Sequence, residues 1–342
     1  MLGVACASEA HSPESEADKP SALAASTSIR AITLDARDRP DPALLDSLRD
    51  LGATHLTLVT FGFQRGIDAT EIRMHTDGGW YSESDAGIRT LAQQAEARGM
   101  GLILKPHIWI GDYDGSEQNR QDIAFDTEAG WQAWTQQYRQ LLMHYARLAQ
   151  DVGAEVLVIG TELRGVVTGR PEFWRTLIDE VRAVYDGQLT YAANWYEEYE
   201  QVPFWDRLDY VGVQAYFPLT DAADPSVDAL RRGWQPHIDA LARVAKQADR
   251  PVLFTELGYR SVGYAAEEPW RWPERREQAA PAPELQARLY RAFFEAVAPQ
   301  PWFAGAIVWK WHPTAEGRRP LGFTPQNKPA EQVLQNGFTP DS

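Results

Sequence analysis

Two stretches of this sequence end in the same way, Val-Leu-Val-Ile-Gly-Thr-Glu at 156–162 and Pro-Val-Leu-Phe-Thr-Glu at 251–256. Both are apolar at successive positions, which is typical of strands in a parallel sheet that is covered on both faces. Each then ends on a glutamate, Glu162 in the first and Glu256 in the second. A carboxylate at the end of such a strand is costly unless it is hydrogen-bonded, paired or used in chemistry. The two stretches therefore predict buried parallel strands that carry functional glutamates at their carboxyl ends.

Similar apolar runs recur along the chain and alternate with amphipathic segments. The eight predicted strands are residues 29–34, 55–60, 101–107, 155–162, 189–194, 210–216, 251–256 and 304–309. Apolar residues at helical spacing predict helices at 42–51, 127–150, 225–248 and 283–298. Eight strands alternating with helices over roughly 300 residues predict an α/β fold of the (β/α)8 TIM-barrel type.

A doubly wound open sheet is the competing architecture. It usually places a glycine-rich phosphate loop directly after the first strand. Here the first strand continues into Asp-Ala-Arg-Asp-Arg-Pro at 35–40, which contains no glycine. We therefore expect the barrel and, because no interior linker divides the chain, a single domain over residues 29–342.

Composition excludes several classes of function. The 342 residues include 33 Lys and Arg against 48 Asp and Glu, which leaves a formal net charge of −15. With 44% hydrophobic and 24% charged residues, the chain has the composition of a folded globular protein. The acidic balance argues against a nucleic-acid partner, because phosphate binding needs clustered basic side chains. No apolar run approaches ~18 residues, so no transmembrane segment is expected.

The first 28 residues show no hydrophobic periodicity and are rich in Ser, Ala, Glu and Asp, which predicts a flexible tether. Ala5-Cys6 within this tether resembles the cleavage region of a bacterial lipoprotein signal, although Gly3 departs from that pattern. The resemblance implies an exported protein, periplasmic or extracellular, that is lipid-anchored through Cys6. An ordinary flexible terminus with an incidental cysteine is the alternative. Because Cys6 is the single cysteine, an internal disulfide is excluded.

The two glutamates indicate a particular chemistry. In a parallel barrel, functional groups gather at the carboxyl ends of the strands, so Glu162 and Glu256 are expected to face one cleft. Glycoside hydrolysis uses two such carboxyl groups: one protonates the leaving oxygen while the other attacks the sugar or activates water. For each glutamate alone, a salt-bridged residue at the rim of the barrel is the alternative interpretation.

The sequences around the glutamates, Ile-Gly-Thr-Glu-Leu at 159–163 and Phe-Thr-Glu-Leu-Gly-Tyr at 254–259, resemble glycoside hydrolase family 113, the β-1,4-mannanase family of clan A. The resemblance covers the predicted barrel. It implies a retaining mechanism with Glu162 as the general acid/base and Glu256 as the nucleophile. Retention would place the two carboxyl groups ~5–5.5 Å apart.

The resemblance also assigns supporting roles. Tyr216, in Val-Gln-Ala-Tyr-Phe at 213–217, matches the clan's tyrosine that donates a hydrogen bond to the nucleophile. Trp309, in Ile-Val-Trp-Lys-Trp at 307–311, matches the tryptophan beneath the reacting sugar. For both residues, packing in the core is the alternative. His107, Asn194 and Trp195 lie at predicted strand ends, where contacts with sugar hydroxyls are expected, and His107 could equally be a structural histidine.

Three departures from the clan's pattern concern how the sugar is held, and therefore which sugar it is. Thr161 stands where many clan members have an asparagine before the acid/base, and we expect it to contact the substrate. Gln214 replaces a histidine, and the second strand shows no evident arginine.

Tryptophan is abundant, with 13 residues, and its positions favour a carbohydrate cleft. Sugar rings present apolar faces that stack on indole. The tryptophans at predicted strand ends or in the loops that follow are Trp80, Trp109, Trp195, Trp205, Trp270, Trp272, Trp309 and Trp311. Among them, Trp109 and Trp272 are added to the predicted substrate contacts. The long loop at 260–283 is expected to form a wall of the cleft or to gate it, and a mobile surface excursion is the alternative.

The sequence therefore predicts a retaining glycoside hydrolase that cleaves β-1,4-linked mannan or manno-oligosaccharides. Another β-glycan such as glucan or xylan, or exo action, would use the same mechanism. Outside enzymes, a carbohydrate-binding barrel without turnover and a metal-free α/β binding protein are the alternatives. We expect no metal and no cofactor, because two carboxyl groups suffice, and we expect a monomer.

Overall fold

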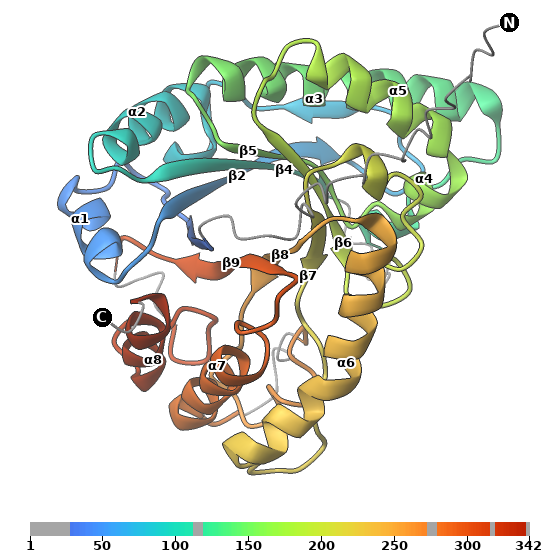
Figure 1. Ribbon diagram of the computed structural model, residues 1–342. Helices are drawn as coiled ribbons and strands as arrows, with labels where there is room; N and C mark the ends of the chain where they lie inside the picture. Colours follow the sequence, from blue (N-terminus) through green and yellow to red (C-terminus); the bar gives the residue numbers. More distant parts are fainter. Residues whose placement is uncertain (1–27, 112–118, 272–278, 315–318, 340–342) are drawn as a thin grey trace, which may run out of the picture.

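The computed structural model describes residues 28–111, 119–271, 279–314 and 319–339. Its centre is a closed barrel of eight parallel strands, in which β1 pairs with both β2 and β9 (Figure 1). The strands are β1 (Ile29–Leu34), β2 (His55–Gln64), β4 (Gly101–Ile110), β5 (Val156–Thr161), β6 (Gln188–Asn194), β7 (Val211–Gln214), β8 (Val252–Leu257) and β9 (Phe303–Trp311). The predicted (β/α)8 barrel is confirmed. Cys6, Trp272 and residues 1–27 of the predicted tether lie outside the described residues.

Strands β2 and β4 continue beyond the carboxyl ends that the sequence predicts for them. β2 and β4 pair in continuous register from His55 opposite Gly101 to Gln64 opposite Ile110. A short antiparallel strand, β3 (Ile72–Met74), pairs with the far end of β2. The prediction stopped short because Gly62 and Gln64 interrupt the apolar run. The two strands therefore extend beyond the predicted ends and form a wall beside the mouth of the barrel.

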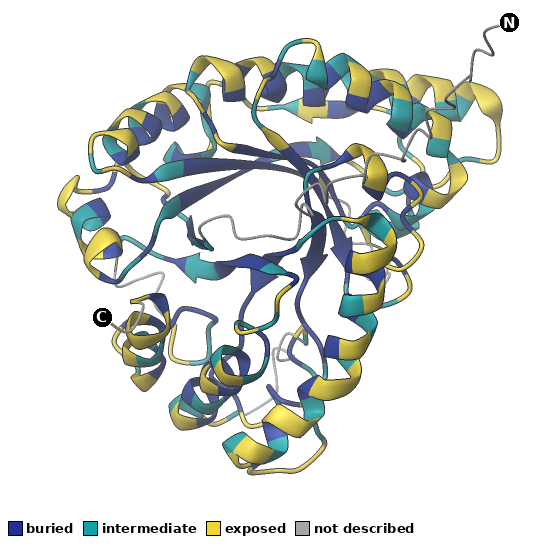
Figure 2. Cartoon of the chain, viewed as in Figure 1, coloured by how far each residue is buried: buried dark blue, intermediate teal, exposed yellow. Residues whose placement is uncertain are grey.

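Helices surround the barrel, and they bury their inner faces while exposing the outer ones (Figure 2). They are α1 (Ala43–Asp50), α2 (Asp85–Glu96), α3 (Glu128–Asp151), α4 (Arg164–Gly169), α5 (Pro171–Arg182), α6 (Val227–Ala248), α7 (Pro283–Ala296) and α8 (Pro329–Phe338). The four helices that the spacing predicts correspond to α1, α3, α6 and α7. Thr127 and Ser226 accept backbone hydrogen bonds at the starts of α3 and α6, and Pro283 opens α7.

Short 3-10 helices complete the connections: η1 (Tyr81–Glu83), η2 (Arg120–Asp122) and η3 (Trp205–Arg207). Residues 195–210, which connect β6 to β7, are all described, and they contain η3 but no α-helix.

The prediction that Trp205 belongs to the aromatic set of the cleft is wrong. It is buried, and its Nε1 donates to the Tyr199 carbonyl at 2.9 Å. The reason is its position just before β7, at the amino end of the strand and away from the mouth.

Aromatic side chains fill the space between β5 and the surrounding helices. Gly160 on β5 leaves room for this layer: a Cβ atom there would lie within 2.9 Å of Trp174, Tyr138 and Tyr191. Trp134 and Trp174 are fully buried on their helices, as packing residues. In the part of the chain that the structure describes, no helix combines the length and apolarity that a membrane span requires.

Candidate active site

Glu256 lies on β8 with its side chain almost completely buried. Lys105 Nζ donates to its Oε1 atom at 2.6 Å, and the Tyr216 hydroxyl donates to its Oε2 atom at 2.6 Å. Both carboxylate oxygens are therefore held by short hydrogen bonds, one of them from a cation. The structure places the predicted residue Tyr216 in direct contact with Glu256.

Lys105 is a site residue that the sequence reasoning missed. It is fully buried on β4, and its ammonium also donates to Gln214 Oε1 and to the Thr255 carbonyl, each at 2.9 Å. With Glu256, these acceptors match the three protons of the ammonium. The available signal was a lysine inside an apolar strand, Leu-Ile-Leu-Lys-Pro at 102–106. Gln214, the departure from the clan's histidine, serves here to hold Lys105.

Charge around Glu256 favours its ionised form. Burial raises the pKa of Glu256, but the positive charge of Lys105 and the hydrogen bonds from Lys105 and Tyr216 outweigh burial and hold the pKa below its ordinary value. Burial also lowers the pKa of Lys105, and the negative charge of Glu256 opposes that shift. At neutral pH the site therefore presents a buried carboxylate that is fixed in place.

His107 lies two residues after Lys105 and on the same face of β4, because side chains alternate along a strand. Its Nε2 atom is 3.9 Å from Glu256 Oε1, and its ring is nearly parallel to that of Trp309, with centroids 6.4 Å apart. Burial and the nearby charge of Lys105 hold the pKa of His107 well below its ordinary value, so the imidazole is neutral. Its Nε2 atom is buried and has no hydrogen-bond partner among the described residues.

Glu162 follows β5 directly and adopts a left-handed backbone conformation, with φ of 53°. This conformation costs a non-glycine residue on the order of 1 kcal/mol and is typical of functional sites. Its amide donates to the Ala192 carbonyl at 2.9 Å. Arg120 donates to Glu162 Oε2 through Nε at 3.0 Å and through a terminal nitrogen at 2.8 Å. Arg120 comes from η2, a segment without hydrophobic periodicity, so no sequence signal pointed to it.

The two glutamates share one electrostatic environment. Lys105, Arg120 and Tyr216 each interact with the charges of both Glu162 and Glu256. The carboxyl groups therefore face the same mouth of the barrel, at the carboxyl ends of β5 and β8. The predicted separation of ~5–5.5 Å stays a prediction.

The remaining predicted residues lie around this mouth and differ in burial and in the contacts they make. Asn194 is buried at the end of β6, and its side-chain amide donates to Gln121 Oε1 at 3.1 Å. Thr161 is buried at the end of β5. Trp195 stacks against Trp270 with centroids 5.0 Å apart, and Trp270 is 42% exposed.

The wall formed by β2 and β4 presents further aromatic rings toward the mouth. Trp109 is 42% exposed, and its ring meets Phe61 edge-on with centroids 5.8 Å apart. Phe61 in turn contacts His107, with centroids 5.6 Å apart. Because residues 105, 107 and 109 share one face of β4, an aromatic surface leads outward from the buried Lys105.

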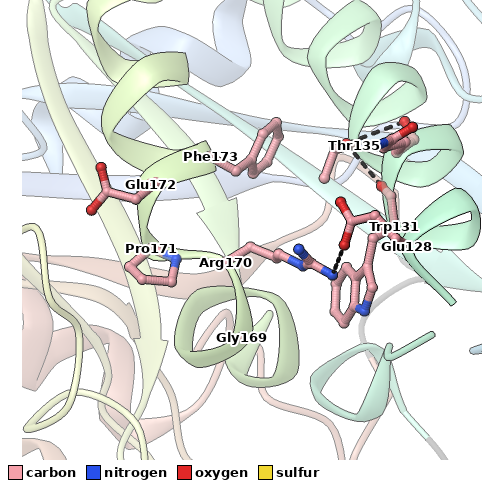
Figure 3. A pocket seen from close by; sticks show the side chains of 9 residues that line it. Glu128, Trp131, Thr135, Gly169, Arg170, Pro171, Glu172 and Phe173 are labelled. Atoms are coloured by element: carbon pink, nitrogen blue, oxygen red, sulfur yellow. Dashed lines mark hydrogen bonds and ion pairs between the residues drawn. The ribbon is translucent and has the colours of Figure 1, made fainter. Parts of the chain in front are cut away.

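A pocket of about 310 Å³ lies elsewhere on the surface, between α3 and the junction of α4 and α5 (Figure 3). Its Arg170 lies over the Trp131 ring at 4.8 Å and pairs with Glu128 at 2.7 Å. The protein's own arginine therefore covers the aromatic face, and neither Glu162 nor Glu256 lines this pocket. Across the described residues, no group of three or more His, Cys, Asp or Glu side chains could hold a metal ion. The mouth of the barrel is the candidate active site.

Comparisons with known proteins agree with this geometry. The model of Glycoside Hydrolase Family 113 matches residues 38–320. The structure of the GH113 β-mannanase AaManA from Alicyclobacillus acidocaldarius, in complex with ManMIm, superposes with a TM-score of 0.78 at 27% identity, over 93% of this chain and 99% of that one. A GH113 β-1,4-mannanase gives a TM-score of 0.76 at 25% identity, over 91% and 98% of the chains.

More distant structures show the fold alone. A β-D-glucuronidase from Dictyoglomus thermophilum has a TM-score of 0.62 at 12% identity, over 92% of this chain and 51% of that one. The comparison with curated proteins gave no match.

Proposed function

Because this chain belongs to Glycoside Hydrolase Family 113, we propose that it cleaves β-1,4-linked mannan or manno-oligosaccharides with retention, using Glu256 as nucleophile and Glu162 as acid/base. The observation that carries the proposal is the pair of strand-end glutamates at one mouth, with Glu256 held ionised by Lys105 and Tyr216. The mannanases at 25–27% identity support the choice of substrate.

In the first step, the Glu256 carboxylate attacks the anomeric carbon of the sugar. Glu162 gives its proton to the glycosidic oxygen, the bond from the anomeric carbon to that oxygen breaks, and the leaving chain departs as an alcohol. The product is an ester between the sugar and Glu256. Lys105 loses an ionic partner in this step but keeps Gln214 and the Thr255 carbonyl as acceptors.

In the second step, Glu162 is a carboxylate and takes a proton from water. The water oxygen bonds to the anomeric carbon, the ester bond breaks, and Glu256 returns as a carboxylate. Two inversions at one carbon give net retention. Arg120 donates two hydrogen bonds to Glu162 Oε2 and holds the carboxylate in position for this step.

We assign the sugar-binding surface to the other residues at the mouth. His107 lies beside Glu256, and the Trp309 ring is nearly parallel to the His107 ring. We assign a hydroxyl contact to His107 and a stacking face to Trp309. Trp109 and the exposed Trp270, stacked on Trp195, offer aromatic surfaces at opposite parts of the rim. Thr161 and Asn194 complete the proposed contacts, with Trp272 proposed from the sequence alone.

The test is cleavage of β-1,4-mannohexaose by the wild type and by Glu256→Gln, with Glu172→Gln as a control for the same change at an exposed position. We expect internal cleavage by the wild type and the control, and none by Glu256→Gln. Full activity of Glu256→Gln would overturn the nucleophile assignment. Cleavage of gluco- or xylo-oligosaccharides in place of mannohexaose would overturn the substrate.

Location and assembly complete the proposal. We propose that the protein is exported, anchored through a lipid on Cys6, and monomeric. Labelling of the expressing cells with a radioactive fatty acid tests the anchor: label in the wild type and its loss in Cys6→Ser are expected, whereas an unlabelled wild type contradicts it.

A further inference from the structure

Glu198 is a buried carboxyl group that the proposed reaction does not use. It lies in the turn after β6 and is 1% exposed. Its Oε2 atom accepts from the backbone amide of Asn194 at 2.7 Å, and its Oε1 atom accepts from the Tyr191 hydroxyl at 2.5 Å. Burial raises the pKa of Glu198 to about 7, and the negative charge of Glu162 acts in the same direction. Glu162 therefore lies close enough for its charge to affect the pKa of Glu198.

The Tyr191 hydroxyl connects Glu198 to the backbone beside the acid/base. It accepts a hydrogen bond from the amide of Leu163, the residue after Glu162, at 2.6 Å. A hydroxyl has one proton, and here that proton points to Glu198, so a lone pair is left to face Leu163. Burial and the charge of Glu198 raise the pKa of Tyr191 well above its ordinary value, so the hydroxyl keeps its proton.

Strand β6, which carries Tyr191, also binds the backbone amide of Glu162 itself. The Glu162 amide donates to the carbonyl of Ala192, the residue after Tyr191. Two consecutive residues of β6 therefore hold the two consecutive amides of Glu162 and Leu163. The strained left-handed conformation of Glu162 depends on such external contacts, because a non-glycine residue does not adopt it readily.

A second connection reaches the side chain of Glu162. Glu198 accepts from the backbone amide of Asn194, and the side chain of Asn194 donates to Gln121 Oε1 at 3.1 Å. Gln121 follows Arg120, which binds the Glu162 carboxylate. Glu198 is thus linked to Glu162 along two routes, one through its backbone and one through its carboxylate partner.

We propose that Glu198 is a positioning residue for the acid/base: it orients the Tyr191 hydroxyl and the end of β6, which together hold Glu162 where it protonates the leaving oxygen. This inference rests on the proposed function. Loss of the positioning impairs reactions that need the acid and spares those that do not.

The test compares substrates with different leaving groups. Mannohexaose needs protonation of its leaving oxygen, whereas a dinitrophenyl β-mannoside releases a stable anion without help. We expect Tyr191→Phe to lower the ratio of kcat/KM for mannohexaose over that for the aryl mannoside by about ten-fold or more, part of the effect of a general acid. Glu198→Gln is expected to lower the ratio in the same direction.

A matched control removes another buried tyrosine hydroxyl. Tyr185 donates to the Ala154 carbonyl at 2.8 Å, at the amino end of β5, so Tyr185→Phe is expected to leave the ratio unchanged. An unchanged ratio in Tyr191→Phe and Glu198→Gln, or an equal fall in Tyr185→Phe, would overturn the inference. If circular dichroism shows Tyr191→Phe unfolded, Glu198→Gln decides. A wild type that hydrolyses gluco- or xylosides instead contradicts the proposed substrate alone, and the ratio is then measured on that sugar.

Discussion

Glu256, the proposed nucleophile, is held in place by Lys105 and Tyr216. Glu256 keeps its charge in a buried place because Lys105 lies against it and donates to Oε1. Such a pair is costly to bury, and removal of one partner leaves the other charge uncompensated. Lys105 therefore serves both the stability of the fold and the ionisation of Glu256, the proposed nucleophile.

We predict that Lys105→Met shifts the pH profile of kcat/KM. Lys105 lowers the pKa of Glu256, so its removal raises that pKa. Activity requires the carboxylate, so the acidic limb of the profile moves to higher pH. The unpaired charge also lowers the free energy of unfolding at neutral pH by about 3–5 kcal/mol, which denaturation in urea measures.

Tyr216→Phe removes a neutral hydrogen bond from the same carboxylate and keeps Lys105. It is expected to move the acidic limb in the same direction by a smaller amount. If neither variant moves this limb, Glu256 is not the group whose ionisation controls activity.

A second prediction concerns Glu162→Ala. Without the general acid, kcat/KM for mannohexaose is expected to fall by about 10²–10⁴-fold, while kcat/KM for the dinitrophenyl mannoside stays close to that of the wild type. Azide, which needs no general base, should raise kcat on the aryl substrate and form a β-mannosyl azide, detectable by NMR. Equal losses on both substrates would remove Glu162 from the acid/base role.

The residues of the site differ in how far the sequence could predict them. Glu162 and Glu256 follow apolar strands, and their motifs match a family. Lys105 carries only a weak signal, a charged residue among apolar ones. Arg120 and Glu198 carry none, because their roles depend on where loops return in space, which local patterns do not encode.

Among the elements, β5 shows how packing controls the site. The glycine before Thr161 lets three aromatic rings approach the strand that ends at Glu162. One of those rings belongs to Tyr191, whose hydroxyl accepts from Leu163. The packing of this layer and the geometry of the acid/base are therefore connected.

Gly160→Ala is predicted to destabilise the protein and disturb catalysis together. The new methyl group would lie 2.8–2.9 Å from ring atoms of Trp174 and Tyr191 and from the Tyr138 hydroxyl oxygen, so the layer must shift. Overpacking of this kind costs about 1–3 kcal/mol. Thermal unfolding measures the cost, and Gly263→Ala, where nothing lies within 4 Å, is the control. Equal stability of the two variants would mean that the layer is not tightly packed.

Periodicity did not single out α2, α4, α5 and α8, but the eight barrel strands and the helices α1, α3, α6 and α7 could be predicted from it. The additions that shape the mouth could not. β2 and β4 run past their apolar segments, and β3 is too short to show a pattern. Pairing between the extended strands and β3, a non-local effect, stabilises these parts.

At the scale of the whole molecule, the barrel is closed by the pairing of β1 with β9. Gly305 lies opposite Ile29 in this pairing, with φ of 145°, and a Cβ atom there would lie 2.1 Å from the Ile29 carbonyl oxygen. The closure therefore requires glycine at this position.

Gly305→Ala is predicted to lower the free energy of unfolding by about 3 kcal/mol or more, because backbone atoms cannot move aside as side chains do. Gly99→Ala, at φ of 68° with nothing within 4 Å, is the control for a glycine replaced at positive φ without a close contact. Urea denaturation compares the two variants. Equal losses would show that contact across the closure is not what Gly305 provides.

The proposed mechanism requires a covalent bond between Glu256 and the sugar, and this intermediate can be trapped. The wild type is incubated with 2-deoxy-2-fluoro-β-mannosyl fluoride. The 2-fluorine slows both steps, but the anomeric fluoride leaves readily when Glu256 attacks, so the ester with Glu256 accumulates. The peptides are then examined by mass spectrometry. We expect one added fluoromannosyl group on the peptide that contains Glu256, attached to that residue. A label on another residue, or inversion at the anomeric carbon in an active enzyme, would contradict the role of Glu256 as nucleophile.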